Sequence, residues 1–141
     1  MGKFEDRLIL WNQLRTDNQS NDLETALLAI NDWWQLLPLD SHYLHWDDVD
    51  NWPDPWDLLA DGIFSLTSKS LGIVYTLHLI NRPEINDLQF AQTSDGDNLV
   101  LVNQGKYILN WAPGEMLNTS TAQKIQITQV MNASVVTKKL D

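Results

Sequence analysis

From Trp52 to Ile80 the chain reads Trp-Pro-Asp-Pro-Trp-Asp-Leu-Leu-Ala-Asp-Gly-Ile-Phe-Ser, then Leu-Thr-Ser-Lys-Ser-Leu-Gly-Ile-Val-Tyr-Thr-Leu-His-Leu-Ile, and this stretch decides the fold. Asp54 is a good N-terminal cap, and Pro55 suits the first helical position because its missing N–H is not needed there. Gly72 can end a helix in the left-handed conformation. The β-branched and aromatic residues over 73–77 are typical of a buried strand. The sequence therefore predicts a long central helix that turns at Gly72 and leads into a strand.

Two further helices are predicted before this stretch. Phe4, Leu8 and Trp11 recur at helical spacing within residues 3–15, and an apolar stripe that begins at Leu23 marks residues 22–36. Both stripes are broad. We therefore expect residues 1–38 to form a helical hairpin that packs on the rest of the domain or on another subunit.

The rest of the chain has the character of an antiparallel sheet. Residues 88–93, 98–102 and 107–111 are predicted strands separated by turn-forming residues, residues 124–130 form a half-exposed strand, and Val135 and Val136 extend the sheet or form a tail. We predict one α+β domain in which a Trp- and Asp-rich loop over 39–54 follows the hairpin. In residues 55–141 the central helix packs on the sheet.

Composition narrows the function. The 141 residues carry a formal net charge of −10, and residues 1–61 hold thirteen acidic residues against three basic ones. Such an acidic half repels phosphate groups and anionic lipid, so we expect neither nucleic-acid nor membrane binding. No apolar run is long enough to span a membrane, and none resembles a signal peptide. The absence of cysteine excludes disulfides, thiolate metal sites and a cysteine nucleophile.

A metal site deserves consideration in the loop before Trp52, because it combines imidazole and carboxylate groups, which are common metal ligands. These groups belong to His42, His45, Asp47, Asp48 and Asp50. Their spacing matches neither an EF-hand nor a zinc motif. We therefore favour a solvated acidic loop and expect no metal and no cofactor. The third histidine, His78, is expected to pack within the strand that follows the central helix.

Residues 52–112 resemble the transglutaminase-like part of the papain-like superfamily, in which a Trp- and Pro-bearing stretch leads to a nucleophile near the start of the central helix. The resemblance implies a nucleophile position at Ser65, a base position at Asn98 and an orienting position at Asn110. A serine lacks the acidic thiol of a cysteine, and an asparagine cannot take up a proton near neutral pH. We therefore expect these three positions to be vestigial and the chain not to be an enzyme.

A second resemblance rests on the amino-acid sequences of three segments: Tyr43-Leu-His-Trp-Asp47, Trp52-Pro-Asp-Pro-Trp-Asp-Leu-Leu59 and Leu71-Gly-Ile-Val-Tyr-Thr76. They are similar to small proteins of T-even-like marine tailed bacteriophages. The resemblance implies a virion component of the tail, baseplate or neck, assembled in the host cytoplasm as part of a hetero-oligomer with other virion proteins.

We expect a non-catalytic structural protein that contacts its neighbours through tryptophans, which anchor many protein interfaces. The interface candidates are Trp11, Trp33, Trp34, Trp46, Trp52 and Trp56. Two alternatives remain open. One is a papain-like hydrolase or amidase that uses Ser65 with a histidine from residues 42–45. The other is an acidic adaptor or inhibitor that binds a basic partner protein.

Overall fold

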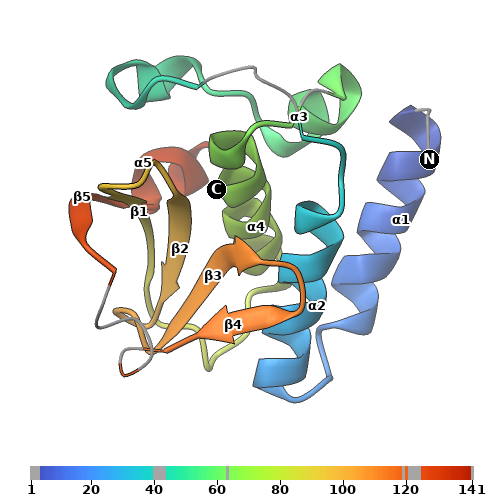
Figure 1. The fold of residues 1–141 in the computed structure, drawn as a ribbon. Helices are drawn as coiled ribbons and strands as arrows, with labels where there is room; N and C mark the ends of the chain where they lie inside the picture. The colour runs from blue at the N-terminus through green and yellow to red at the C-terminus, as the bar shows by residue number, and fades with distance from the viewer. Residues whose placement is uncertain (1–3, 40–43, 63, 119, 121–124, 141) are drawn as a thin grey trace.

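A computed structural model describes residues 4–39, 44–62, 64–118, 120 and 125–140. Helices cover one face of an antiparallel five-stranded sheet whose strands lie in the order β4-β3-β2-β1-β5 (Figure 1). The strands are β1 (Leu88–Thr93), β2 (Asn98–Val102), β3 (Tyr107–Ala112), β4 (Glu115–Leu117) and β5 (Ile127–Asn132). This arrangement confirms the predicted α+β class and the predicted meander.

The N-terminal part confirms the two predicted helices. Helix α1 (Phe4–Asp17) and helix α2 (Leu23–Gln35) run in opposite directions side by side (Figure 1). The carboxylate of Asp22 caps α2 by accepting a hydrogen bond from the backbone N–H of Thr25 at 3.1 Å. Both helices bury apolar side chains against the rest of the chain, since Trp11 of α1 and Ile30 and Trp34 of α2 are fully buried. Ile9 and Leu10 of α1 are exposed.

The central stretch forms two helices rather than one helix and a strand. Helix α3 (Pro55–Asp61) is capped by Asp54 as predicted but ends at Gly62, whose φ is +67°. Helix α4 (Leu66–Ile80) then continues through residues 73–77. The predicted strand is therefore wrong, and the physical reason is burial. Helix α4 is enclosed on nearly every side, so β-branched and aromatic residues suit it although they are typical of strands.

Gly72 does not end a helix, as the sequence predicted, but provides close packing in the middle of α4. A Cβ atom built at this position would lie 2.4 Å from carbon atoms of the Trp34 ring. The indole of Trp34 therefore lies directly against the α4 backbone. The helix ends instead at Asn81, which takes the left-handed conformation with φ of 50°.

The remaining short elements were not predicted. A 3-10 helix, η1 (Trp46–Asn51), lies within the predicted irregular loop. Helix α5 (Ser134–Thr137) and the 3-10 helix η2 (Lys138–Leu140) follow β5, so Val135 and Val136 neither extend the sheet nor form a tail. None of the helices in the described ranges is long and apolar enough to cross a membrane.

Most of the predicted interface tryptophans belong to the main core, which lies between the helices and the sheet. Trp11 and Trp34 are fully buried and Trp52 is 4% exposed, so these three cannot contact a partner while the domain stays folded. Trp33 and Trp46 are half-buried against the same core. Trp56 alone among the six candidates is strongly exposed, at 44%, although its ring makes an edge contact with Trp11.

Candidate functional site

Ser65 lies at the N-terminus of α4, as the resemblance to the papain-like superfamily implied. Its hydroxyl caps the helix by accepting a hydrogen bond from the backbone N–H of Ser68 at 3.2 Å. The Ser68 hydroxyl accepts from the backbone N–H of Ser65 at 2.5 Å, which completes a reciprocal capping box. The two hydroxyl oxygens lie 3.2 Å apart, and Ser65 is only 6% exposed. The hydroxyl is therefore held firmly in place.

Asn110 joins the three positions that the resemblance singled out. Its side-chain amide donates to the carbonyl of Leu66 at 3.1 Å and to the carbonyl of Asn98 at 2.7 Å. Its backbone, with φ of +67°, is left-handed within β3, and its N–H donates to the Asn31 side chain at 2.7 Å. The start of α4, the start of β2 and the end of β3 thus meet at one buried point beside Ser65.

The side chain of Asn98 forms its hydrogen bonds away from Asn110. Its carbonyl oxygen accepts from Gln92 at 3.3 Å, and its amide donates to the Gly96 carbonyl at 3.4 Å, both within the β1–β2 hairpin. The backbone carbonyl of Asn98 is the group that meets Asn110. An amide in the base position holds the hairpin together here, and amides do not accept protons near neutral pH.

Two further residues of the site were missed by the sequence interpretation. The side-chain amide of Gln35 donates to the Asn110 side-chain oxygen. Lys69 is 4% exposed, and its ammonium donates to the carbonyls of Gln35 at 2.8 Å and Leu37 at 2.6 Å. Burial lowers the pKa of the Lys69 ammonium below its usual range. The available signal was a lysine near the start of an otherwise apolar and weakly polar helix.

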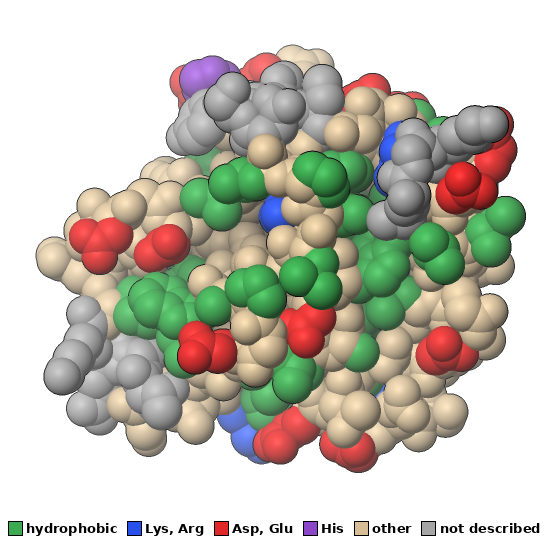
Figure 2. Space-filling model, turned by 45° about the vertical axis from the view of Figure 1, so that its right-hand side comes forward, with side chains coloured by type: hydrophobic (Ala, Val, Ile, Leu, Met, Phe, Trp, Pro, Cys, Tyr) green, Lys and Arg blue, Asp and Glu red, His purple; other side chains and the backbone are tan. Residues whose placement is uncertain are grey.

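Exposed apolar side chains surround this buried polar network. Leu36 and Leu39 follow α2 and are 72% and 64% exposed, while Leu66 and Trp111 are each 38% exposed. Leu36 follows Gln35 in the chain, and Trp111 follows Asn110. The carbonyl of Leu66 accepts from Asn110. Leu39 forms a β-bridge with Phe64, the residue before Ser65. We call these four residues the hydrophobic rim. Figure 2, which brings the right-hand side of Figure 1 forward, shows hydrophobic side chains gathered in the middle of that face.

The histidines lie in different parts of the molecule. His42 lies outside the described residues. His45 precedes η1, and its carbonyl accepts from the Trp52 indole at 2.8 Å. His78 belongs to α4 rather than to a strand, and it lies thirteen positions after Ser65 along the helix, a rise of about 20 Å. His78 therefore cannot take a proton from Ser65. In the described part of the chain, no three His, Cys, Asp or Glu side chains are grouped so that they could hold a metal ion.

Solved structures of LapG from Legionella pneumophila share this architecture. The calcium-bound form is 14% identical and covers 95% of this chain and 78% of its own, with a TM-score of 0.73. The EGTA-treated form is 15% identical and covers 94% and 76%, with a TM-score of 0.72. No protein-family model matches the chain, and no curated protein matches it in sequence.

The chain has a transglutaminase-like fold. The prediction that the chain is not an enzyme is contradicted, because the architecture that it shares with LapG is an enzyme fold. At 14–15% identity the likeness shows the fold alone, and it does not link the chain to phage virion proteins.

Proposed function

We propose that this protein is an assembly protein of a tailed-phage virion that contacts a neighbouring subunit through the hydrophobic rim. The observation that carries the proposal is the exposure of Leu36, Leu39, Leu66 and Trp111 around one buried polar network. Covering such side chains is favourable by about 25 cal/mol for each Å² of apolar surface removed from water. Apolar surfaces gathered in one place mark interaction sites more often than scattered ones do.

The virion setting is supported by the sequence resemblance to tailed-phage proteins over segments 43–47, 52–59 and 71–76. Charge adds a constraint on the partner. Residues 1–61 carry the whole formal net charge of −10, and α2, which leads into Leu36 and Leu39, belongs to that acidic half. A partner surface with an apolar centre and basic residues around it would therefore fit best.

The test uses a rim variant and a matched control in the phage that encodes the chain. Leu36→Ser with Leu39→Ser removes the two most exposed rim side chains, and Ile9→Ser removes a side chain that is 66% exposed on α1, outside the rim. We expect purified particles to contain at least about tenfold less of the rim variant, because a central interface anchor is worth 2 kcal/mol or more. The Ile9→Ser control should be incorporated at the wild-type level.

Mass spectrometry of purified particles measures this incorporation relative to the major capsid protein. Circular dichroism of the purified variants checks that both remain folded, as expected for surface substitutions. Absence of the chain from wild-type particles, or normal incorporation of the folded rim variant, would contradict the proposal.

A second candidate function is hydrolysis or amide transfer at Ser65. It is favoured by one observation: Ser65 begins the central helix of a transglutaminase-like fold, beside the point where Asn110 joins Leu66 and Asn98. Attack by a serine hydroxyl requires a base to take its proton. The hydrogen-bond partner of the Ser65 hydroxyl that could take part is the hydroxyl of Ser68, a weak base. A histidine of residues 42–45 would have to supply the proton transfer.

A fluorophosphonate probe, which reacts covalently with activated serine hydroxyls, tests this candidate. We expect an active enzyme to be labelled at Ser65, to lose the label in Ser65→Ala and to keep it in Ser68→Ala. Peptide mass spectrometry locates the modified residue. If the wild-type chain stays unlabelled while a known serine hydrolase in the same tube is modified, this candidate is wrong.

A further inference from the structure

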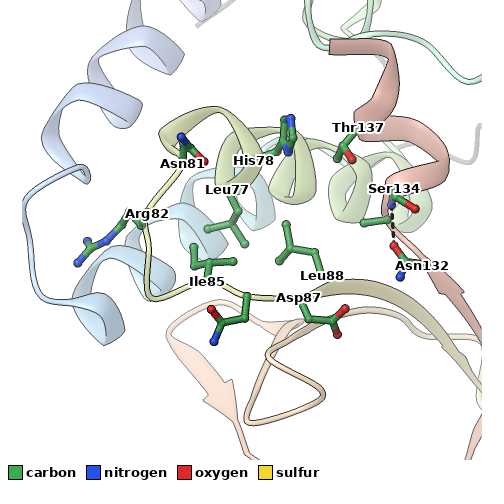
Figure 3. Close-up of a pocket in the computed structure, with 12 residues that line it drawn as sticks. Leu77, His78, Asn81, Arg82, Ile85, Asp87, Leu88, Asn132, Ser134 and Thr137 are labelled. Carbon is green, nitrogen blue, oxygen red and sulfur yellow. Dashed lines mark hydrogen bonds between the residues drawn. The ribbon is translucent and has the colours of Figure 1, made fainter. Parts of the chain in front are cut away.

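A pocket of about 310 Å³ lies at the opposite end of α4 from Ser65. The end of α4, the segment that leads into β1 and the turn between β5 and α5 enclose it. Its size is at the lower limit of small-molecule sites in proteins. In Figure 3 the apolar side chains of Leu77, Ile85 and Leu88 lie between His78 at the top and Asp87 at the bottom.

Asp87 is the group in this pocket whose bonding is incomplete. Its Oδ2 atom is buried and has no hydrogen-bond partner. The backbone carbonyl of Asp87 is occupied, because it accepts from the N–H of Asn103 at 2.8 Å. A carboxylate oxygen that is withdrawn from water without a donor costs free energy, so it would gain from a donor supplied by a ligand. Asp87 lines the pocket, and the terminal torsion of aspartate is soft enough for the carboxylate to turn toward a donor placed there.

Arg82, a cationic residue of the lining, does not donate to Asp87. Its guanidinium pairs with Glu84 at 2.7 Å and donates to the carbonyls of Asn18 and Asn21. Figure 3 shows the Arg82 side chain pointing away from the centre of the pocket. The other polar side chains of the lining include the uncharged groups of Asn132 and Thr137, and His78 lies across the pocket from Asp87, beyond the apolar side chains (Figure 3). The negative charge of Asp87 is therefore left for an incoming cation.

We propose that this pocket binds a primary alkylammonium group, with the ammonium at Asp87 and the alkyl chain against Leu77, Ile85 and Leu88. The positively charged head supplies donors to the carboxylate, and the methylene groups cover the apolar wall. The group is carried either by a free amine or by the lysine side chain of a partner polypeptide. This site is separate from Ser65 and from the hydrophobic rim, so its test does not depend on the proposed virion function.

Nuclear magnetic resonance titration of the full chain with n-butylammonium at low salt tests the proposal. We expect saturable shifts confined to the amides of residues that line the pocket, and no saturable shifts with n-butanol or acetate. Nα-acetyl-lysine methylamide forms a second arm, and tighter binding of this ligand than of n-butylammonium would identify a polypeptide lysine as the source.

Matched variants show whether Asp87 is the anchor. Asp87→Asn keeps the shape of the side chain and removes its charge, and we expect affinity to fall about tenfold or more. Asp95→Asn makes the same charge change in the exposed β1–β2 turn and should bind as the wild type does. Ser134→Phe narrows the pocket from an exposed position and leaves Asp87 in place, so it should also weaken binding. Equal affinity in Asp87→Asn and wild type, shifts outside the pocket, or no saturation would overturn the proposal.

Discussion

At the scale of single residues, the hydroxyl of Thr76 joins three helices at one point. It accepts a hydrogen bond from the indole N–H of Trp11 at 2.8 Å and another from that of Trp34 at 3.0 Å. It also donates to the carbonyl of Gly72 at 2.7 Å. Both indoles are fully buried, so water cannot replace the hydroxyl. One small polar side chain thus fixes how α1 and α2 sit on α4.

Thr76→Val keeps the shape of this side chain and removes the acceptor. We expect the free energy of unfolding to fall by about 2–4 kcal/mol, because two buried N–H donors lose their partner at about 1–3 kcal/mol each. Thr76→Ser keeps the hydroxyl and should lose only about 1 kcal/mol with the missing methyl group. Urea unfolding of the three proteins measures the difference. Equal stability of the valine and serine variants would show that the shared hydroxyl is not what stabilises the contact.

Tyr75 gives the stability of the domain a dependence on alkaline pH. Its hydroxyl donates to the Pro53 carbonyl at 2.7 Å, and burial, together with the charge of Asp54, raises the pKa of Tyr75 above its usual 10.0. Above pH 10 the unfolded chain therefore loses this proton while the folded chain keeps it. Folding then becomes less favourable as pH rises, whereas below pH 10 both states stay protonated and this group contributes no pH dependence.

Tyr75→Phe removes both the hydrogen bond and the titration. At pH 7 we expect the variant to be less stable than the wild type by about 1 kcal/mol. At pH 11 this deficit should shrink or reverse, because the phenylalanine cannot lose a proton in the unfolded chain. All other ionisable groups are the same in both proteins, so comparing the two by denaturant unfolding cancels their effect. A deficit that stays the same at both pH values would mean that Tyr75 does not control the alkaline stability.

At the scale of elements, the start of α4 depends on its cap. We expect Ser65→Ala to lower the free energy of unfolding by about 1 kcal/mol, because the N–H of Ser68 loses its acceptor at a buried helix end. Ser65→Thr keeps a capping hydroxyl and should retain most of the stability. Thermal unfolding of the two variants measures the effect, and an alanine variant as stable as the wild type would show that the capping box contributes nothing.

The elements also show where sequence patterns suffice. Helices α1 and α2 each bury one side, so their apolar residues recur with a readable period. Strand β2 is buried at every position, and β1 to β3 were located by the turn-forming residues between them. Helix α4 is enclosed by α2, α3 and the sheet, and enclosure on all sides removes the period. A glycine after a helical pattern predicts a helix end. The actual role of Gly72 is to pack against Trp34, 38 positions away, and no local pattern encodes a contact of that range.

The residues of the candidate site likewise fall into those that the sequence interpretation named and those that it missed. Ser65, Asn98 and Asn110 were singled out by the resemblance to the transglutaminase-like family, which implies one position near the start of the central helix, one at a strand start and one at a strand end. Gln35 and Lys69 could not be located, since their contacts span 75 and 34 residues, to Asn110 and to Gln35 respectively. Three of the six tryptophans proposed for an interface, Trp11, Trp34 and Trp52, fill the core instead. Their abundance in the sequence indicated large buried side chains, but not which surface they would bury.

At the scale of the whole molecule, the charge distribution is poorly balanced. The formal net charge is −10, and several of the cations donate to carbonyls or lie over rings instead of pairing with carboxylates. Lys69 donates to the carbonyls of Gln35 and Leu37, Lys139 donates to three carbonyls of residues 49–52, and the Arg15 guanidinium lies 4.1 Å from the centre of the Trp11 ring. Repulsion among the exposed carboxylates therefore opposes the compact state.

Salt should consequently stabilise the folded chain at neutral pH. Raising NaCl from 0.01 M to 0.1 M shortens the screening distance from about 30 Å to about 10 Å, which weakens repulsion between distant charges more than it weakens close pairs. We expect the free energy of unfolding to rise by on the order of 1 kcal/mol. Asp47→Asn with Asp50→Asn removes two exposed charges from η1, so this variant should be more stable than the wild type at 0.01 M and gain less from added salt. Urea unfolding at both salt concentrations measures these differences. A wild-type chain that loses stability as salt is added would show that attraction between opposite charges outweighs repulsion among the carboxylates. The charges of the acidic half would then stabilise the folded state.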